Sequence, residues 1–511
     1  MRSGFLVLAS AIASAATSQN AAPPNVVIIL ADDLGYGDIS CQNLNSKIKT
    51  KWIDQLSSEG IRFTDAHSAS GVSSPSRYSL LTGRYHWRGN LKTGIINQWG
   101  DPAIEEGRMT IALMLKEKGY QTACIGKWHL GQTWPFRPGL GQNDNSKISW
   151  SNISMNGKED WTPDAFDWSM PIKDGPTAKG FDYYFGTGTI NFPPYTWIEN
   201  DRVLEIPTEM LNLGILKTDE GSWECRPGPA AKGWDITRVP GRLTDKAVEW
   251  INDRRGNDEP FFLYYALPSP HAPIIPEKEF RGTSQAGAYG DYVVQTDMAV
   301  GRVLEALRLI GFENNTIVIF TSDNGPETYA YPRIKKYDHY SMGNWRGLKR
   351  DLWEGGTRVP FIVRYPGVIK PSTVSKQLIC QTDIISTLAS FTGITLPAGT
   401  CEDSFDMSAA MRNETFPETI RESVIYHTIN GNFAIRKGAW VLIESTTGEV
   451  SKEPEWRKAE YGSQTDTGEM VLYNLESDPR QKENLITLFC EKARELRDLL
   501  ENIRNNDLRL N

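Results

Sequence analysis

Short apolar runs rich in β-branched residues recur along the chain and alternate with stretches of helical periodicity. Runs that are apolar at nearly every position are typical of strands buried on both faces, in a largely parallel sheet covered by helices. The predicted strands are 25–31, 122–126, 260–266, 316–321 and 359–364, and the predicted helices are 110–118, 243–254, 289–310 and 382–391. The sequence therefore predicts a doubly wound α/β fold.

Two regions depart from this alternation. Residues from about 132 to 240 are rich in Gly, Pro, Asn and Trp, and we interpret them as long insertions over one rim of the sheet. Beyond about 415, short strand-like pieces precede a charged helix at 488–504, which predicts a small antiparallel sheet with one helix. We therefore divide the chain into a main domain over 23–415 and a C-terminal α+β subdomain over 416–511.

The N-terminal residues have the pattern of a secretory signal. Arg2 precedes the apolar stretch 5–13 and a small-residue cleavage pattern, so we assign residues 1–18 to a signal peptide and expect a secreted or periplasmic protein. No later stretch is apolar for the roughly 20 residues that a membrane span needs. Six cysteines fit export but lack paired zinc spacing, and their disulfide pairing, like the oligomeric state, stays open. The net charge of −8 disfavours nucleic acid and anionic membranes as partners.

Carboxylates follow two of the predicted strands. Asp32 and Asp33 come directly after the first strand, and Asp323 and Asn324 follow the strand at 316–321. In a doubly wound sheet, ligands bind beyond the carboxyl ends of the strands, where glycines such as Gly35 let the chain turn and adjacent side chains converge. Three carboxylates and an amide oxygen suit Ca²⁺, and less well Mg²⁺, rather than zinc or copper. Either turn alone would also serve as an ordinary capping device.

Two more strand ends bring basic side chains. Lys127 and His129 follow the strand at 122–126, and His271 follows the strand at 260–266. A single His is also an ordinary hydrogen-bonded structural residue, and Lys349, in a charged segment, would by itself be a solvated side chain. Their shared position at one edge of the sheet makes them candidates for acid–base and anion-binding roles.

The segment at 73–84 predicts a helix that starts at an anion site. Pro75 favours the first helical position and the serines before it favour a cap, so the helix should run through residue 81. Arg77 would lie one turn below Ser73 on the same face. Free backbone N–H groups and the guanidinium then suit a tetrahedral oxyanion. The alternative is an ordinary Ser-Pro helix start with a surface Arg.

Taken together, these residues resemble the formylglycine-dependent sulfatases, in the arylsulfatase and carbohydrate-sulfatase branch of the alkaline phosphatase superfamily. The resemblance covers nearly the whole mature chain, and residues 472–479 with 484–485 look like the family's C-terminal signature. It implies an alkaline-phosphatase-like, mostly parallel sheet, and it implies that residues 23–415 form a catalytic domain of a sulfuric ester hydrolase. The implied metal ligands are Asp32, Asp33, Ser73, Asp323 and Asn324, and the implied catalytic residues are Ser73, Arg77, Lys127, His129, His271 and Lys349.

The resemblance also implies a mechanism. Ser73 would be converted to 3-oxoalanine (formylglycine), whose hydrate attacks sulfur beside a bound Ca²⁺. Arg77, Lys127 and Lys349 would offset charge on the sulfuryl oxygens. His271, or Lys349, would protonate the departing alcohol, and His129 would remove a proton so that sulfate leaves.

Position 73 departs from the commoner family pattern, which has Cys there. Maturation enzymes that oxidise Ser are described for anaerobic bacteria, so a maturation enzyme acting on Ser73 is an implied partner. Three alternatives stay open: a Ser-type bacterial enzyme, an immature form, and an engineered replacement of Cys by Ser.

The substrate is less defined than the chemistry. Export, 16 Trp residues and long rim insertions favour a sulfated saccharide, with a galactose- or N-acetylgalactosamine-type unit, and a small aryl sulfate is the other candidate. The segment at 191–197 could stack on a sugar or pack on its own domain. The alternative functions are a phosphoester or phosphonate hydrolase of the same superfamily and a catalytically silent protein that binds sulfated glycans. The sugar, the sulfate position and exo or endo action stay open.

Overall fold

The computed structural model describes residues 22–138, 163–218, 220–412, 414, 419–461 and 468–506. The predicted signal peptide at 1–18 and the predicted boundary between 415 and 416 lie outside these residues, and so does part of the predicted insertion region.

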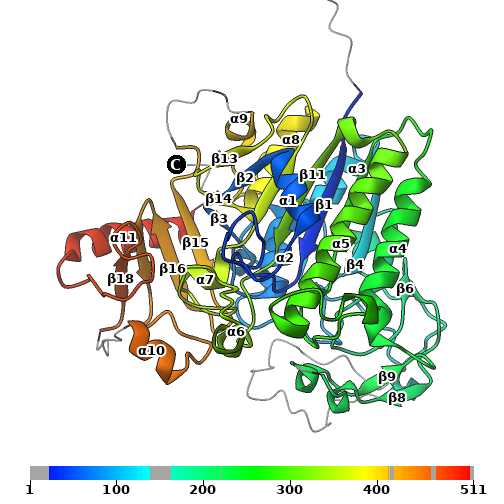
Figure 1. The fold of residues 1–511 in the computed structure, drawn as a ribbon. Helices are drawn as coiled ribbons and strands as arrows, with labels where there is room; N and C mark the ends of the chain where they lie inside the picture. Colours follow the sequence, from blue (N-terminus) through cyan, green and yellow to red (C-terminus); the bar gives the residue numbers. More distant parts are fainter. Residues whose placement is uncertain are drawn as a thin grey trace, which may run out of the picture.

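Ten strands form the main sheet, in the order β13-β2-β12-β11-β1-β10-β4-β5-β6-β7 (Figure 1). The five central strands are mutually parallel: β11 (Thr316–Ser322), β1 (Asn25–Ala31), β10 (Phe261–Ala266), β4 (Gln121–Lys127) and β5 (Tyr183–Thr187). The outer strands make the sheet mixed: β12 (Phe361–Arg364), β2 (Ile61–Phe63), β6 (Ile198–Glu199) and β7 (Arg202–Val203) run antiparallel to their inner neighbours, and β13 (Thr373–Ser375) pairs parallel with β2. The predicted fold class is confirmed.

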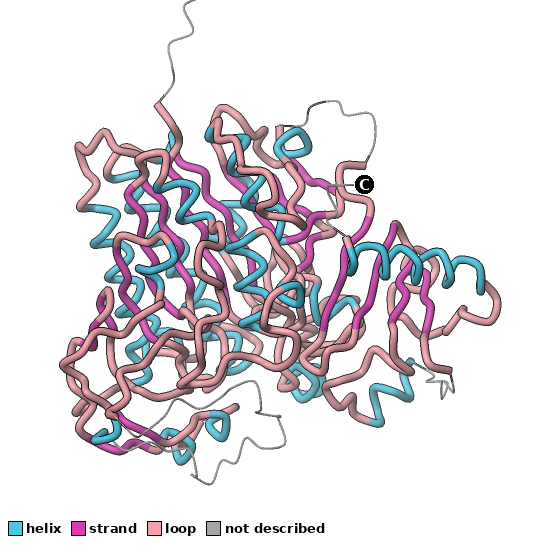
Figure 2. Tube along the Cα trace, turned by 180° about the vertical axis from the view of Figure 1, so that it is seen from behind, coloured by secondary structure: helices cyan, strands magenta, loops and turns pink. Residues whose placement is uncertain are grey.

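Two hydrophobic cores lie on the two faces of this sheet, as alternation along β1 requires. Val26 and Ile28 face one core and Val27 and Ile29 face the other. Helices α2 (Ser73–Thr82), α3 (Ile111–Lys116) and α8 (Ile384–Thr392) contribute to the first core, and α1 (Lys51–Ser58), α4 (Val239–Asn252) and α5 (Gly287–Leu309) contribute to the second. Figure 2 shows the strands between these helical layers. The helices predicted at 110–118, 243–254, 289–310 and 382–391 are present, with ends shifted by a few residues.

Strand β5 corrects the prediction that residues 132–240 lie wholly over the rim. It pairs with β4 in a register that sets Gly186 beside Gly126. A Cβ built on Gly186 would lie 1.9 Å from the Gly126 carbonyl oxygen, so the two backbones approach too closely for a side chain. The small sheet of β8 (Glu209–Leu211) and β9 (Gly228–Ala230), in contrast, does lie along the rim, at the bottom of Figure 1.

The C-terminal region forms a four-stranded antiparallel sheet, as predicted. Its strands are β15 (Ser423–His427), β16 (Phe433–Lys437), β17 (Trp440–Ile443) and β18 (Val471–Asn474), with α11 (Cys490–Asn505) packed on it and α10 (Glu455–Tyr461) beside it. Its core includes Tyr85 and Trp353 of the preceding region, so the two regions share buried surface. The remaining short elements are β3 (Ala66–His67), β14 (Ile379–Cys380), α6 (Ala330–Tyr337), α7 (Glu354–Thr357) and α9 (Ser408–Met411).

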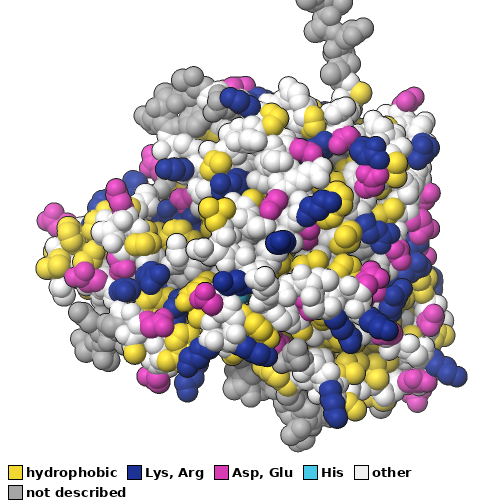
Figure 3. Space-filling view, viewed as in Figure 1, with side chains coloured by type: hydrophobic (Ala, Val, Ile, Leu, Met, Phe, Trp, Pro, Cys, Tyr) yellow, Lys and Arg dark blue, Asp and Glu magenta, His cyan; other side chains and the backbone are white. Residues whose placement is uncertain are grey.

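All six cysteines lie in the described residues, and each is a free thiol in the structure. Among the described helices, none combines the length and apolar character that crossing a bilayer requires. On the face drawn in Figure 3, acidic and basic side chains are interspersed.

Candidate active site

The turns after β1 and β11 bring the four predicted oxygen ligands together. The Asp33 backbone N–H donates to Asp323 Oδ1 at 3.2 Å, and Asn324 Nδ2 donates to Asp33 Oδ1 at 2.8 Å, across about 290 positions of sequence. Asp33 has φ 61°, a left-handed conformation that turns the chain directly after the strand. These side chains and that of Asp32 are buried. The strand-end rule therefore located the acidic cluster correctly.

Ser73 is the first residue of α2 and lies against this cluster. Its Oγ is 3.3 Å from Asp32 Oδ1 and 3.4 Å from Asn324 Oδ1. The prediction that serines cap this helix is wrong, because the N-cap residue is Val72 and makes no side-chain cap. Tertiary contacts use the hydroxyls instead: Ser73 Oγ faces the acidic cluster, and Ser74 Oγ accepts the backbone N–H of Ile96 at 3.1 Å.

Arg77 is fully buried one turn into α2, so the alternative of a surface Arg is wrong. Its Nε and Nη2 donate to Asp323 Oδ2 at 3.1 and 2.9 Å, and its Nη1 donates to the Lys127 carbonyl oxygen at 3.0 Å. Burial opposes ionisation of Asp323, but the charges of Arg77 and then Lys127 outweigh it and hold the pKa of that carboxyl well below its usual range. Asp323 is therefore an anion in the cluster.

Two buried lysines balance the other carboxylates. Lys127 Nζ lies 2.5 Å from Asp32 Oδ2, and Lys349 Nζ lies 2.7 Å from Asp33 Oδ2. Burial disfavours the charged form of Lys349, but Asp33 and then Glu327 outweigh it and raise its pKa above the ordinary value. Burial, and next the negative charge of Asp323, raises the pKa of Asp32. Lys349 is thus part of the cluster and is not a solvated side chain.

The two predicted histidines are both buried next to the cluster. His129 Nε2 lies 2.9 Å from the Ile96 carbonyl oxygen, which can only accept, so Nε2 carries the proton and Nδ1 is a lone-pair acceptor. Nδ1 of His129 has no hydrogen-bond partner within the described part of the chain. His271 Nδ1 lies 2.6 Å from the Ala272 carbonyl oxygen, and its Nε2 lies 3.6 Å from Asp33 Oδ2. Burial, and next Lys349, lowers the pKa of His271 to about 3.

A cavity of about 190 Å³ opens above Ser73. It is lined by segments that are far apart in the chain: Val72, Ser73, Ile95, His129, Asn191, Phe192, Trp223, Glu224, Arg226, His271, Lys349 and Arg350. The predicted residues Ser73, His129, His271 and Lys349 belong to this lining. The sequence alone did not indicate Glu224 or its neighbours, which lie in an irregular insertion without a motif.

In the aromatic segment at 191–197, one part packs on its own domain and another part lines the cavity. Trp197 stacks on Phe185, with ring centroids 5.1 Å apart, and also packs against Trp234, so it belongs to the domain core. Asn191 and Phe192, in contrast, line the cavity.

The donor atoms of the acidic cluster fit a hard divalent cation. Ligand atoms of Asp32, Asp33 and His271 lie within 4.8 Å of one another, and the oxygens of Asp323 and Asn324 lie at the same turns. Oxygen-rich sets of this kind suit Ca²⁺ or Mg²⁺. Ser73 lies beside these carboxylates, which are paired with the buried cations Arg77, Lys127 and Lys349. Such an arrangement can hold a tetrahedral oxyanion next to a nucleophile.

A second group of possible ligands, Asp65, His67 and Glu354, has a different character. Arg358 Nη2 lies 2.9 Å from Asp65 and 2.6 Å from Glu354, and Arg436 Nη1 lies 2.6 Å from Asp65. The arginines neutralise these carboxylates, so we interpret the group as a buried ion-pair network between the main sheet and the C-terminal sheet.

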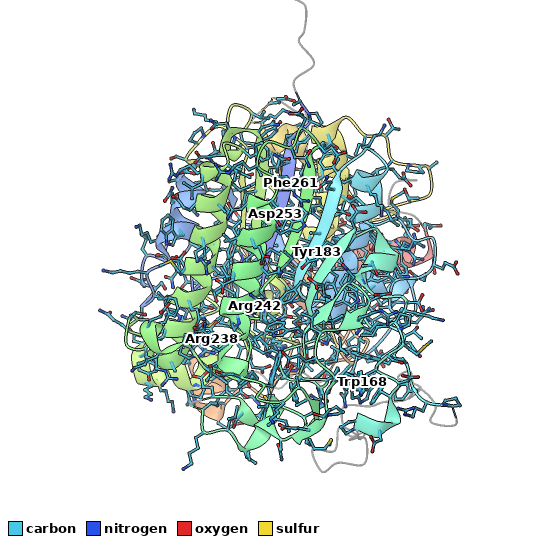
Figure 4. The ribbon with its side chains drawn as sticks, turned by 90° about the vertical axis from the view of Figure 1, so that its right-hand side faces the viewer. Trp168, Tyr183, Arg238, Arg242, Asp253 and Phe261 are labelled. Carbon is cyan, nitrogen blue, oxygen red and sulfur yellow. The ribbon has the colours of Figure 1, made fainter. Side chains whose placement is uncertain are left out.

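A wider hollow of about 680 Å³ lies between α4 and the start of β5. Its lining includes Tyr183 and Asp253. In Figure 4 these two residues lie on the side of Phe261, at the start of β10, and away from Trp168. The hollow therefore lies at the amino ends of the strands, where ligands of such sheets do not bind.

Comparison with known proteins bears on this site. The Sulfatase family model matches residues 24–394, and a model of the C-terminal region of N-sulphoglucosamine sulphohydrolase matches residues 345–506. The chain is 33% identical to an N-acetylgalactosamine-6-O-sulfatase of Bacteroides thetaiotaomicron, over 95% of this chain and 94% of that protein. It is 32% identical to human arylsulfatase A, over 95% of this chain and 86% of that protein.

Two solved structures have the same fold as this chain. A Bacteroides thetaiotaomicron structure, described under the metabolism of multiple glycosaminoglycans, superposes with a TM-score of 0.78 at 30% identity, covering 95% of this chain and all of that one (100%). A sulfatase from Pseudoalteromonas sp. superposes with a TM-score of 0.69 at 24% identity, covering 94% of this chain and 89% of that one, which supports the fold alone.

Proposed function

Since this chain belongs to the sulfatase family and is an enzyme that hydrolyses sulfate esters, we propose that its substrate is a sulfated sugar of the galactose or N-acetylgalactosamine type. The relative from Bacteroides thetaiotaomicron is named for N-acetylgalactosamine 6-sulfate, and it aligns over almost the full length of both chains. We take the 6-sulfate as the first substrate to test.

The proposal includes two groups that complete the site. Ser73 would be oxidised to formylglycine, whose hydrate supplies the nucleophilic oxygen. A Ca²⁺ held by Asp32, Asp33, Asp323 and Asn324 would supply Lewis acidity at that oxygen and at the sulfate. The buried oxygen atoms at the ends of β1 and β11, with Ser73 Oγ within 3.4 Å of two of them, support this assignment.

The surrounding side chains would bind and orient the sulfate. Lys127 contacts Asp32, Lys349 contacts Asp33, and Arg77 contacts Asp323, so a sulfuryl group bound beside this cluster would meet three cations. Cations that lie ready where charge develops lower the barrier because they need no rearrangement during the reaction.

Proton transfer is assigned from the hydrogen bonds of the two histidines. His129 has its free lone pair on Nδ1 and lines the cavity, so it would act as the base that takes a proton from residue 73 and allows sulfate to leave. Lys349, which is protonated in the cluster, would protonate the departing alcohol. His271 beside it would do so only in its charged form, which burial and Lys349 disfavour.

The observation that carries the proposal is the position of Ser73 at the floor of a cavity, between acidic turns and below a base. The experiment measures sulfate release from N-acetylgalactosamine 6-sulfate, galactose 6-sulfate and an aryl sulfate, and phosphate release from the matching phosphate esters. We expect release from the sulfate esters, and faster release of phosphate would instead favour a phosphoester hydrolase.

The modification of Ser73 is tested separately. Peptide mass analysis should show the loss of two hydrogens at residue 73 in active protein. Ser73→Ala should abolish turnover while the circular dichroism spectrum is unchanged. Normal turnover in that variant would contradict the mechanism, and an unmodified, inactive wild-type protein that binds sulfated sugars would indicate a silent binding protein.

A further inference from the structure

One wall of the cavity is made by a rim segment that the mechanism does not use. Trp223, Glu224 and Arg226 belong to the segment around the short 3-10 helix Ser222–Glu224, and all three line the cavity that contains Ser73. Lys349 lines the same cavity, so this wall is within reach of the part of a substrate that leaves after the sulfur–oxygen bond breaks.

The carboxylate of Glu224 is held in place by contacts from other segments. The Tyr329 hydroxyl donates to Glu224 Oε1 at 2.7 Å. The Glu224 carbonyl oxygen accepts from Asn191 Nδ2 and from Arg226 Nη1, each at 3.4 Å. Further back, the Ile274 backbone N–H donates to the Glu220 carbonyl oxygen at 3.1 Å, which ties the segment to the turn after His271. A side chain fixed in this way loses little entropy when a ligand binds.

Glu224 lies next to a second carboxylate, Glu327, which is already paired with cations. Neighbouring Glu327 receives two hydrogen bonds from Arg350, at 2.7 and 2.6 Å, and lies 3.5 Å from Lys349. Burial, and next the negative charge of Glu327, raises the pKa of Glu224 to about 7. Above that pKa Glu224 is an anion, and a desolvated anion gains more free energy from a neutral hydrogen-bond donor than an exposed anion does.

Trp223 adds an apolar surface at the mouth of the cavity. The side chain is 55% exposed, which is unusual for a large aromatic residue next to a polar site. Pyranose rings of the galactose type carry hydroxyls on their edges and C–H groups on one face. An exposed indole beside a fixed carboxylate is complementary to such a ring.

We propose that Glu224 determines specificity for the leaving sugar by accepting hydrogen bonds from its ring hydroxyls or acetamido N–H, while Trp223 stacks on the apolar face of the ring. This inference rests on the proposed function and names the recognition element of the same site. A carboxylate in this wall disfavours a leaving group with a second negative charge facing it, so the expected substrate class is a neutral hexose with one sulfate.

The size of the cavity agrees with a single ring. Its volume of about 190 Å³ is below the roughly 300–1,000 Å³ of pockets that enclose drug-sized ligands. One hexose with its sulfate would fill it, and any further sugar would lie outside, toward Trp223.

The test compares a probe that can donate hydrogen bonds to this wall with one that cannot, and follows the change in the ratio between the two rather than either rate alone. N-acetylgalactosamine 6-sulfate carries ring hydroxyls and an amide, whereas 4-nitrophenyl sulfate carries neither. Hydrogen bonds to a charged group contribute about 1.5–3 kcal/mol, so Glu224→Ala should lower the ratio of kcat/KM for the sugar to kcat/KM for the aryl sulfate about 10- to 150-fold. Glu224→Gln, which keeps the shape, should lower it less. Glu209→Gln, an exposed carboxylate on β8 outside the cavity lining, should leave the ratio unchanged.

A binding arm separates this inference from the proposed function. In the Ser73→Ala background, calorimetry with N-acetylgalactosamine 6-sulfate should show weaker binding when Glu224→Ala is added. If the wild type releases no sulfate but this difference is found, the proposed function fails and the role of Glu224 stands. An equal loss of kcat/KM on both probes, an unchanged ratio, or sugar binding that is absent or does not depend on Glu224, would overturn the inference.

Discussion

The pair of Arg77 and Asp323 gives the sharpest test of how the acidic cluster is held together. Both side chains are fully buried, and Arg77 donates two hydrogen bonds to one carboxylate oxygen at 3.1 and 2.9 Å. Arg77→Met removes both bonds and leaves the buried Asp323 carboxylate without its main cation, with the backbone N–H of Asp33 and the weaker effect of Lys127 remaining. Truncating one partner of a buried ion pair costs about 3–5 kcal/mol, and two hydrogen bonds to a charged group, each worth about 1.5–3 kcal/mol, give a similar figure.

The size of the pairwise term follows from a double-mutant cycle with Asp323→Asn. If the loss in Arg77→Met comes from the stranded carboxylate, neutralising that carboxylate should recover much of it. We expect the double variant to be more stable than the sum of the single losses by about 3 kcal/mol. Urea unfolding in a divalent-ion chelator, followed by tryptophan fluorescence and by circular dichroism, measures each free energy of unfolding, and the two probes should give coincident transitions.

An exposed pair provides the matched control. Arg302 Nη1 lies 2.8 Å from Asp245 Oδ1, but the two side chains are 41% and 49% exposed. The same cycle on this pair should give a coupling below about 1 kcal/mol. Additive losses at Arg77 and Asp323, within about 0.5 kcal/mol, would refute the idea that the two side chains hold the cluster as a charged unit.

Three further predictions concern the ion-pair network at Asp65, the buried His427 and the metal site. Arg436→Met removes two hydrogen bonds to Asp65 and leaves Arg358 as its remaining arginine partner, so it should lower the free energy of unfolding by about 1.5–3 kcal/mol, measured by urea unfolding. Lys437→Met on the same strand should change it by less than about 0.5 kcal/mol. His427 has its pKa lowered to about 3, first by burial and then by Arg504, so the unfolded state takes up its proton first. The contribution of His427 to the free energy of unfolding is therefore fully present above about pH 6.5 and falls by about 1.4 kcal/mol per pH unit below it. When the free energy of unfolding is measured between pH 4.5 and 7, its slope against pH below pH 6.5 should be shallower by that amount in His427→Gln. Finally, adding Ca²⁺ to chelated protein at about 100 times its Kd should raise the free energy of unfolding by about 2.7 kcal/mol, and Asp323→Asn should largely remove this gain.

The sequence predicted most of the sheet because its central strands are buried on both faces. The bounds of β1 coincide with the predicted run, since every residue of 25–31 is buried. Strand β5 was missed because its five residues include Gly186, whose place in the ladder depends on Gly126, about 60 positions earlier. A close approach of two backbones has no local signature in the sequence.

The candidate site divides in the same way. Asp32, Asp323 and the basic side chains were predictable because each follows a strand, and parallel strands bring their carboxyl ends to one edge. Glu224 was not, because its orientation comes from Tyr329, which is 105 positions later and lies in no recognisable pattern. The cap of α2 failed as a prediction because local preference placed the serine hydroxyls on the backbone, whereas the acidic cluster and Ile96 take them.

If Ser73 is oxidised as proposed, its burial sets an order of events during biosynthesis. The side chain is 2% exposed and sits against Asn324, which is 251 positions later in the chain. At about 5–20 residues per second, a ribosome needs roughly 13–50 s to make the intervening segment. For an enzyme that carried out the proposed oxidation, Ser73 would be accessible in that interval, before the second acidic turn exists to cover the serine.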